Sequence, residues 1–254
     1  MNELTRKQRE IQERDELILR TSRNLFHTKG YHNVTMDMIA KEVEYSKGTI
    51  YQHYSSKEAI ISALCLRFSK VILALFEQIY EYENIPAYLK MIMLLEAEQV
   101  IHEYAQCDHD LINLLKTETF SAKLDVDTLH EMSCHVELIM KQVMNIVQEA
   151  VENGELVLKA PATVESISLG GWAMIEGTYE IAEKHTFEVG SITSKYVKNM
   201  LIANSLIFLR GSGWDSIPVD DQGQLKLSSD HKKALKKFRK YSQQLVAQHH
   251  TCQG

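Results

Sequence analysis

Apolar residues recur at helical spacing along most of this chain. The longest stripe contains Ile60, Ile61, Leu64, Phe68, Val71, Ile72, Leu75, Phe76 and Ile79. Apolar positions three or four residues apart lie on one face of an α-helix, and Ser56 is a residue type that caps helix N-termini. The pattern therefore predicts a long amphipathic helix that starts after Ser56.

The same spacing predicts further helices on both sides of this stripe. A first helix is expected over about 5–29, with Gly30 as its C-cap and with Leu17, Ile18, Thr21, Leu25 and Phe26 on one face. After a break at 84–86, helices are expected at about 86–105, 109–118, 126–153, 161–184 and 190–210. A polar connector over 215–230, which we expect to be mobile, then leads to a basic helix whose apolar side carries Leu235, Phe238, Tyr241, Leu245 and Val246. Only three prolines and eleven glycines occur, which favours an all-α fold.

The segment from Thr35 to Lys57 is the most informative part of the sequence. Thr35 and Ser46 each stand where the N-cap of a short helix belongs, and 44–45 interrupts between the two helices. The second helix, expected over Lys47 to Tyr54, carries a polar, aromatic and basic face. Two short helices joined by a turn, with hydrogen-bond donors on the outer face of the second, are typical of a helix that enters the DNA major groove.

Within residues 17–64 the chain resembles the TetR-type (TetR/AcrR-like) transcriptional regulators. The most specific matches are Phe26-x-x-x-Gly30-Tyr31, Thr35 with 39–40, and the SKGTIY run that starts at Ser46. Two departures stand out. Glu44-Tyr45 stands where such proteins usually have Gly-Val in the turn, and 52–54 reads Gln-His-Tyr where they usually end the recognition helix with two aromatics and Phe.

The resemblance implies an all-α homodimer with a three-helix helix-turn-helix head on a larger helical-bundle core. It also implies a repressor that binds a palindromic double-stranded DNA operator and responds to a small molecule. Dimerisation would use the helices at 161–184 and 190–210, where small residues stand beside large ones, although burial in a monomer core would explain those helices as well. The expected domains are 1–60 for DNA binding, 61–214 for effector binding and dimerisation, and 215–254 for a linker and the basic helix.

The recognition segment offers candidates for each kind of DNA contact. Ser46 and Lys47 would meet a phosphate at a helix N-terminus, while Thr49 and Gln52 would reach base edges. Lys57 would bind a phosphate at the start of the next helix, and the tyrosines would contact the backbone or pack beneath the helix. The alternative is that Tyr51 and Tyr54 are core aromatics and Lys57 is a solvated charge. The predicted DNA-binding set is Thr35, Ser46, Lys47, Gly48, Thr49, Tyr51, Gln52, His53, Tyr54 and Lys57.

Charge is distributed unevenly along the chain. The formal net charge is −6, made up of +1 for residues 1–60, −10 for 61–214 and +3 for 215–254. An acidic middle segment repels phosphate from most of the surface, so nucleic-acid contacts are expected at the ends of the chain.

An effector pocket in the acidic core would be apolar and adaptable. Its predicted lining residues are Met91, Leu95, Tyr104, Phe120, Met140, Met144, Trp172, Glu176 and Tyr179. Methionine and aromatic side chains adapt to apolar ligands, and Glu176 would orient a polar group. Ordinary core packing is the alternative for each of them.

Other chemistries find little support in the sequence. His130, Cys134 and His135 could face one another on a helix and Cys107 precedes His109, but the spacing is loose and a structural interpretation is favoured over a metal site. No catalytic motif is recognisable, so we expect no enzyme, metal or cofactor. The remaining alternatives are an architectural or partner-recruiting DNA-bound protein without a ligand, and a helical metal sensor or enzyme.

Cellular location is also predicted from composition. The charged first residues do not form a signal peptide, and the apolar runs at 92–95 and 201–209 are too short to span a membrane. Four widely spaced cysteines without a CxxC pair are expected to be reduced. We therefore expect a cytoplasmic protein with no membrane partner.

Overall fold

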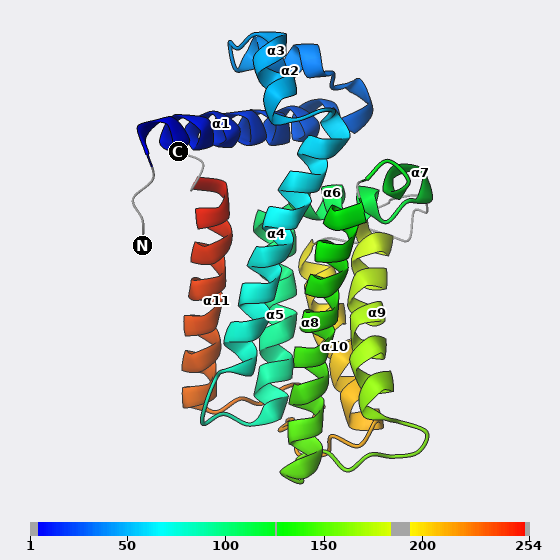
Figure 1. The fold of residues 1–254 in the computed structure, drawn as a ribbon. Coiled ribbons are helices and arrows are strands. Elements are labelled where there is room, and N and C mark those ends of the chain that lie inside the picture. The colour runs from blue at the N-terminus through cyan, green and yellow to red at the C-terminus, as the bar shows by residue number, and fades with distance from the viewer. Residues whose placement is uncertain (1–4, 125, 184–193, 252–254) are drawn as a thin grey trace. The chain divides into compact units, whose positions relative to one another are not determined.

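The computed structural model describes residues 5–124, 126–183 and 194–251, and these residues fold into helices joined by loops (Figure 1). No strand occurs among the described residues, where Val219 and Leu225 form an isolated bridge. The all-α class predicted from the sequence is confirmed.

The first helix, α1 (Arg6–Lys29), begins and ends at the residues that the sequence predicted. Thr5 and Gln8 form a capping box, in which each side chain bonds to the backbone of the other residue. Gly30 ends the helix with a φ of 76°, a conformation that glycine adopts without steric cost. A 3₁₀ turn, η1 (Tyr31–Asn33), then leads to the next helix.

Two short helices, α2 (Met36–Glu42) and α3 (Lys47–His53), follow with the predicted N-caps. The side chain of Thr35 accepts the Met38 N–H, and that of Ser46 accepts the Thr49 N–H. Glu44, in the turn between the two helices, has a φ of 58°. This left-handed conformation costs a non-glycine residue roughly 1 kcal/mol, which explains why glycine is usual at this point of the turn.

The long helix α4 (Lys57–Tyr80) forms the next element, and Ser56 caps it through the N–H of Ala59 at 3.1 Å. Of the described helices it is the one that is long and apolar enough to cross a membrane by length and composition. Half of its apolar window is buried inside the protein, with Ile60, Leu64 and Phe68 fully enclosed. Burial in the core therefore accounts for its apolarity.

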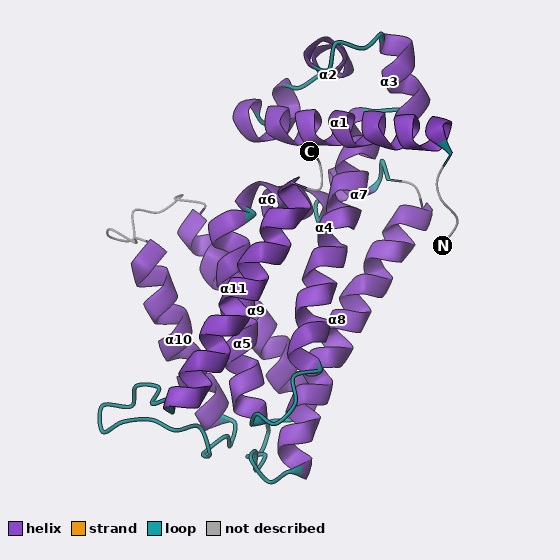
Figure 2. Cartoon of the chain, turned by 90° about the vertical axis from the view of Figure 1, so that its left-hand side faces the viewer, coloured by secondary structure: helices purple, strands orange, loops and turns teal. Residues whose placement is uncertain are grey.

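The remaining helices follow the predicted order with small shifts (Figure 2). They are α5 (Ala87–Tyr104), α6 (Gln106–Leu115), α7 (Glu118–Ser121), α8 (Val126–Glu152), α9 (Val164–Glu183), α10 (Ser194–Gly211) and α11 (Ser229–Thr251). The segment predicted as one helix at 109–118 is divided between α6 and the short α7. Helices α9 and α10 pack closely at Gly170, where an added Cβ would lie 2.8 Å from the ring of Phe208.

The polar connector before α11 makes specific contacts with its own residues and with α10. Ile217 is buried and its carbonyl accepts a bond of 2.9 Å from Arg210. The carboxylate of Asp220 accepts the backbone N–H groups of Gln222 and Gln224. These bonds fold the connector into defined turns.

The chain forms two compact units that interleave along the sequence. The first unit comprises residues 1–72, 101–135 and 244–254, and the second comprises 73–100 and 136–243. The hydrophobic core of the first unit joins residues of α1 to α4 with Leu111, Leu115 and Phe120 of α6 and α7. Each unit combines segments that are far apart in the sequence, whereas the predicted domains are consecutive stretches of chain. The predicted domain limits 1–60, 61–214 and 215–254 therefore stay a prediction.

Candidate DNA-binding interface

Helix α3 presents a polar outer face on the first unit. Ile50 is fully buried and fixes the inner side of the helix in the core of the unit. Lys47, Gly48 and Gln52 are exposed, and Tyr51 is 52% exposed. An exposed tyrosine beside an amide and an ammonium group is a surface suited to phosphate and base-edge contacts.

The hydroxyl groups at the start of α3 bond to one another. The oxygen of Ser46 lies 2.8 Å from that of Thr49 and accepts the Thr49 N–H at 3.1 Å. Ser46 therefore holds the first turn of α3, and Thr49 lies half-buried beside it.

An ion pair connects the start of α3 to α2. The ammonium group of Lys47 lies 2.5 Å from a carboxylate oxygen of Asp37, and both side chains are more than half exposed. Exposed pairs of this kind contribute only about 0–1 kcal/mol, because water screens them and two side chains lose freedom. The pair therefore holds the Lys47 side chain only weakly.

A shallow hollow of about 350 Å³ opens beside this face within the first unit. It brings together three of the predicted residues, Thr35, Tyr51 and Lys57. Its other lining residues are Val34, Met36, Asp37, Ser55, Ser56 and Glu58. The starts of α2 and α4 therefore border the hollow. The sequence analysis had identified Thr35 and Ser56 there as helix caps and Lys57 as a candidate for phosphate binding.

Lys57 at this hollow is bound to the protein itself. Its ammonium group donates to the carbonyls of Tyr31 at 2.9 Å and Val34 at 3.0 Å, and it lies 4.1 Å from the centroid of the Tyr31 ring. These contacts attach the η1 turn to α4. The ammonium group of Lys57 therefore lies at the edge of the hollow, but two of its three donors bond to backbone carbonyls.

The hydroxyl of Tyr31 donates a bond of 2.6 Å to Glu58. Burial, together with this carboxylate, raises the pKa of Tyr31 to about 12. Burial alone would raise the pKa of Glu58, but the Tyr31 bond and the nearby Lys123 and Lys57 lower it overall. Glu58 is therefore an ionised partner that fixes Tyr31.

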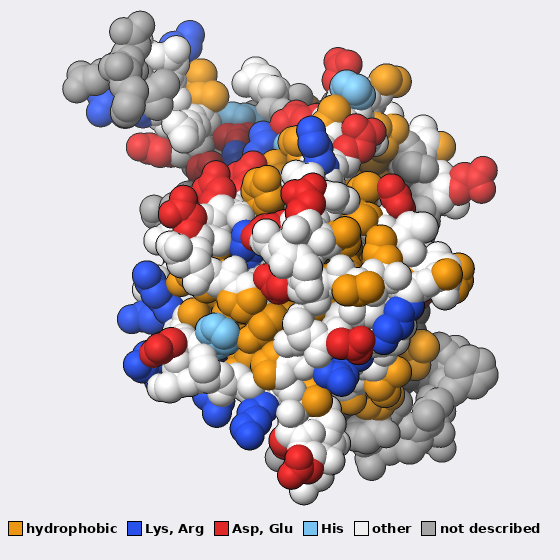
Figure 3. All heavy atoms as spheres, turned by 90° about the horizontal axis from the view of Figure 1, so that it is seen from below, with side chains coloured by type: hydrophobic (Ala, Val, Ile, Leu, Met, Phe, Trp, Pro, Cys, Tyr) orange, Lys and Arg blue, Asp and Glu red, His pale blue; other side chains and the backbone are white. Residues whose placement is uncertain are grey.

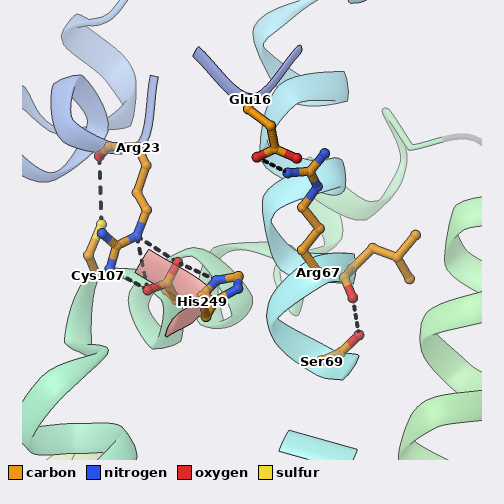
Figure 4. A network of polar contacts seen from close by, with 8 residues as sticks. Glu16, Arg23, Arg67, Ser69, Cys107 and His249 are labelled. Carbon is orange, nitrogen blue, oxygen red and sulfur yellow. Dashed lines mark hydrogen bonds and ion pairs between the residues drawn. The ribbon is translucent and has the colours of Figure 1, made fainter. Parts of the chain in front are cut away.

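The end of α3 points toward α1 instead of outward. Tyr54 donates a bond of 2.6 Å to Asp15, and His53 lies 3.7 Å from the same carboxylate. Arg67 completes the group with bonds to Asp15 at 2.8 Å and Glu16 at 2.7 Å, the second of which is drawn in Figure 4. Burial, and then Asp15, raise the pKa of Tyr54 well above its usual value. Tyr54 and His53 therefore anchor the end of α3 to α1.

Sequence reasoning missed the residues that anchor α3. Asp15, Glu16 and Arg67 lie on α1 and α4, far from the recognition segment in sequence, and their types and spacing give no signal of the contact. Asp37 was missed as well, although its place in the first turn of α2 is typical of a residue near the N-terminal end of a helix.

The predicted effector-binding residues belong to both compact units. Phe120 packs on Tyr31 in the core of the first unit, with ring centroids 5.3 Å apart. Met91 and Leu95 are buried on α5 within the second unit, while Tyr104 is exposed at the end of that helix. Met140 and Met144 are half-buried on α8.

The three candidates on α9 differ from one another in their surroundings. Trp172 is exposed and its indole N–H donates to Glu176 at 3.2 Å. Tyr179 is buried against Val197 and Leu201 of α10. The assignment of these residues to an effector pocket stays a prediction.

The histidines and cysteines singled out in the sequence make ordinary contacts. His135 bonds to Ser69 at 2.8 Å, and the sulfur of Cys134 lies 3.8 Å from His130. Across residues 5–124, 126–183 and 194–251, no three His, Cys, Asp or Glu side chains form a group suited to a metal ion.

The N-terminal helices are similar in sequence to known proteins. Residues 18–64 match the family model described as bacterial regulatory proteins, tetR family. A stretch of 61 residues is 39% identical to the HTH-type transcriptional regulator UidR of Escherichia coli (strain K12), covering 24% of this chain and 31% of UidR. A stretch of 54 residues is 39% identical to the uncharacterized HTH-type transcriptional regulator YuxN of Bacillus subtilis (strain 168), covering 21% of this chain and 19% of YuxN. The matching stretch thus spans less than a third of either curated relative.

Solved structures extend the likeness to the fold. The TetR family regulator PfmR from Thermus thermophilus is 18% identical, with a TM-score of 0.57 over 76% of this chain and 97% of PfmR. The MbdR regulator from Azoarcus sp. CIB is 18% identical, with a TM-score of 0.60 over 77% of this chain and 97% of MbdR. The SmeT–triclosan complex is 17% identical, with a TM-score of 0.60 over 85% of this chain and 99% of SmeT. Residues 18–64 thus resemble the N-terminal part of the tetR family of bacterial regulatory proteins, and the all-helical fold resembles that of solved TetR family regulators.

Proposed function

We propose that this protein represses transcription in the cytoplasm by binding a palindromic operator as a homodimer, and that a small apolar molecule releases it. The observation that carries the proposal is the outer face of α3, where Lys47, Tyr51 and Gln52 are exposed around the buried Ile50. A short helix with this face fits the major groove, and a two-fold dimer places two such helices in successive grooves.

Each exposed side chain has a distinct task in this interface. The Lys47 ammonium group binds a phosphate after leaving Asp37, and Tyr51 contacts the backbone beside it. Gln52 offers an amide N–H that can donate to N7 of adenine and a carbonyl oxygen that can accept from its N6 amino group in the major groove. Lys57 and Tyr54 support the helix through Tyr31, Val34 and Asp15, so their contribution is to its position.

Exposed apolar residues on α9 and α10 support dimerisation. Leu169 and Ile181 on α9 and Ile207 on α10 are each more than half exposed. Figure 3 shows hydrophobic side chains open to solvent between charged ones on the face seen there. We assign these exposed apolar side chains to the contact between two copies.

A response to an effector requires only modest coupling between its site and the DNA. A coupling free energy of about 1–3 kcal/mol changes operator affinity roughly 5–150-fold. The buried apolar side chains of α5, including Met91 and Leu95, favour an apolar ligand in the second unit. Triclosan in the SmeT complex is an example of such a ligand on a related fold.

The test is binding of the purified protein to the DNA upstream of its own gene, compared with random DNA at several salt concentrations. We expect specific binding that weakens with salt, and a loss of affinity in Lys47→Ala and Tyr51→Ala. Lys141→Ala, an exposed lysine on α8, is the matched control and should bind as the wild type does. The absence of any preference for the upstream DNA would refute the proposal, and unchanged binding by both head variants would refute the assignment of α3.

A further inference from the structure

A buried carboxylate in the first unit joins the DNA-binding head to α6. Asp108 on α6 is only 1% exposed. It accepts bonds from Arg23 on α1, at 2.8 and 3.0 Å from Nε and at 2.5 Å from Nη2. A carboxylate is costly to bury without a partner, and a fork-like guanidinium contact of this kind is among the strongest that proteins form.

The last turns of α11 lie at the same carboxylate. The Nε2 atom of His249 lies 3.7 Å from Asp108, and the histidine side chain is 7% exposed. Its ring also packs on Phe68 of α4, with centroids 5.5 Å apart, and Val246 one turn earlier is fully buried. Figure 4 shows Arg23 and His249, which come from α1 and α11.

Arg23 belongs to the helix that supports the recognition segment. Ile18 and Phe26 of α1 share a hydrophobic core with Ile50 of α3, and Leu111 of α6 extends the same core. Because α3 packs on α1, a contact that fixes α1 against α6 at Asp108 also fixes the helix on which α3 rests. Through His249, the end of α11 takes part in that contact.

Helix α11 lies outside the residues that match the family, and its contacts continue along its length. In the second unit, its residue His231 bonds to Tyr88 at 2.9 Å, and Arg239 bonds to Glu96 at 2.6 Å. Its residues from Gln244 onward belong to the first unit.

We propose that His249 is a positioning residue for DNA recognition: its contact with Asp108 holds α1 on α6 in the arrangement in which a dimer fits its operator. The inference rests on the proposed function and adds a role for the C-terminal helix. Loss of the contact leaves each head able to bind a half-site and widens the range of half-site spacings that the dimer accepts.

Two substitutions separate the parts of the His249 contact. His249→Phe keeps an aromatic ring against Phe68 and removes the ring nitrogen near Asp108. His249→Gln is the conservative variant, because its amide N–H can occupy the place of Nε2. Gln244→Ala, an exposed position on the same helix, is the matched control.

The experiment measures affinity for the upstream operator, for versions with one or two base pairs inserted at its centre, and for a single half-site. In wild-type protein and Gln244→Ala, the native spacing should be strongly preferred. In His249→Phe the preference should fall about fivefold or more, at unchanged half-site affinity. His249→Gln should keep the wild-type preference for the native spacing. An unchanged preference, an equal loss on every DNA or a failure of His249→Gln to rescue would overturn the proposal.

Hydrogen exchange of the free protein gives a readout that needs no DNA. We expect faster exchange of α1 amides around Arg23 in His249→Phe, with α2 and α3 unchanged, and no change in Gln244→Ala. Unchanged exchange around Arg23 would overturn the positioning role, whereas absent DNA binding by wild-type protein would overturn the proposed function. If His249→Phe does not fold, deletion of residues 249–254 replaces it in both measurements.

Discussion

Removal of Arg23 should destabilise the protein far more than removal of a surface cation. In Arg23→Met the carboxylate of Asp108 stays in a site where it is 1% exposed, without the guanidinium that pairs with it. Loss of one partner of a buried pair costs about 3–5 kcal/mol, because the remaining charge keeps its desolvation penalty.

Burial, and not distance, sets this magnitude. The Lys47–Asp37 pair has the same 2.5 Å separation as the shortest Arg23–Asp108 contact, yet its side chains are 64% and 59% exposed. An exposed pair contributes about 0–1 kcal/mol, so Asp37→Ala should change the free energy of unfolding by less than about 1 kcal/mol. It is the matched control for Arg23→Met.

The assay is urea unfolding at one fixed protein concentration, followed by helical circular dichroism. A double variant, Arg23→Met with Asp108→Leu, removes both charges and should recover most of the loss, since an apolar pair can replace a buried ion pair at little cost. A loss of under about 1 kcal/mol in Arg23→Met, or a double variant no better than the single one, would refute the account of Asp108 as a carboxylate dependent on Arg23.

Three further outcomes follow from contacts in the head. Glu44→Gly should raise the free energy of unfolding by up to about 1 kcal/mol, and with it the melting temperature, because glycine adopts the φ of 58° without strain. A lower melting temperature would contradict this. Tyr31 has a folded pKa raised to about 12 from 10, so its contribution is complete below pH 10 and is lost as the pH rises toward 12. Unfolding measured across that range should therefore show a smaller decline in Tyr31→Phe than in wild type, and equal declines would exclude the Tyr31–Glu58 bond as the cause. Gln52→Ala should weaken operator binding and relax the preference at one base position, as measured with a set of single-base operator variants; an equal loss on random DNA would instead indicate a phosphate contact.

The parts of the fold that depend on local chemistry could be predicted from the sequence. Thr35 and Ser46 cap their helices with side-chain oxygens only three residues from the N–H groups that they accept, and Gly30 ends α1 by its own backbone freedom. Each of these signals lies within one turn of the chain. The order and approximate limits of most helices follow from such signals and from apolar spacing.

The roles of individual site residues depended on partners that spacing cannot indicate. Lys57 was predicted at a phosphate, and its donors reach carbonyls 23 and 26 residues away. Tyr54 was open to either role until Asp15, 39 residues earlier, proved to be its partner. The interleaving of the two compact units was unpredictable for the same reason, because it depends on contacts between helices far apart in sequence.

The small charge of the head constrains how it can recognise DNA. Residues 1–60 carry a net charge of only +1, and Lys47 starts from a pair with Asp37. Each phosphate neutralised by a protein cation contributes about −0.9 to the slope of log affinity against log salt concentration. In the proposed operator complex, so few excess cations should give a shallow slope. Base contacts by α3 and the spacing of the two heads of the proposed dimer should then supply most of the discrimination. This is why half-site spacing, and the helices that set it, should matter more for this protein than for a strongly basic DNA-binding domain.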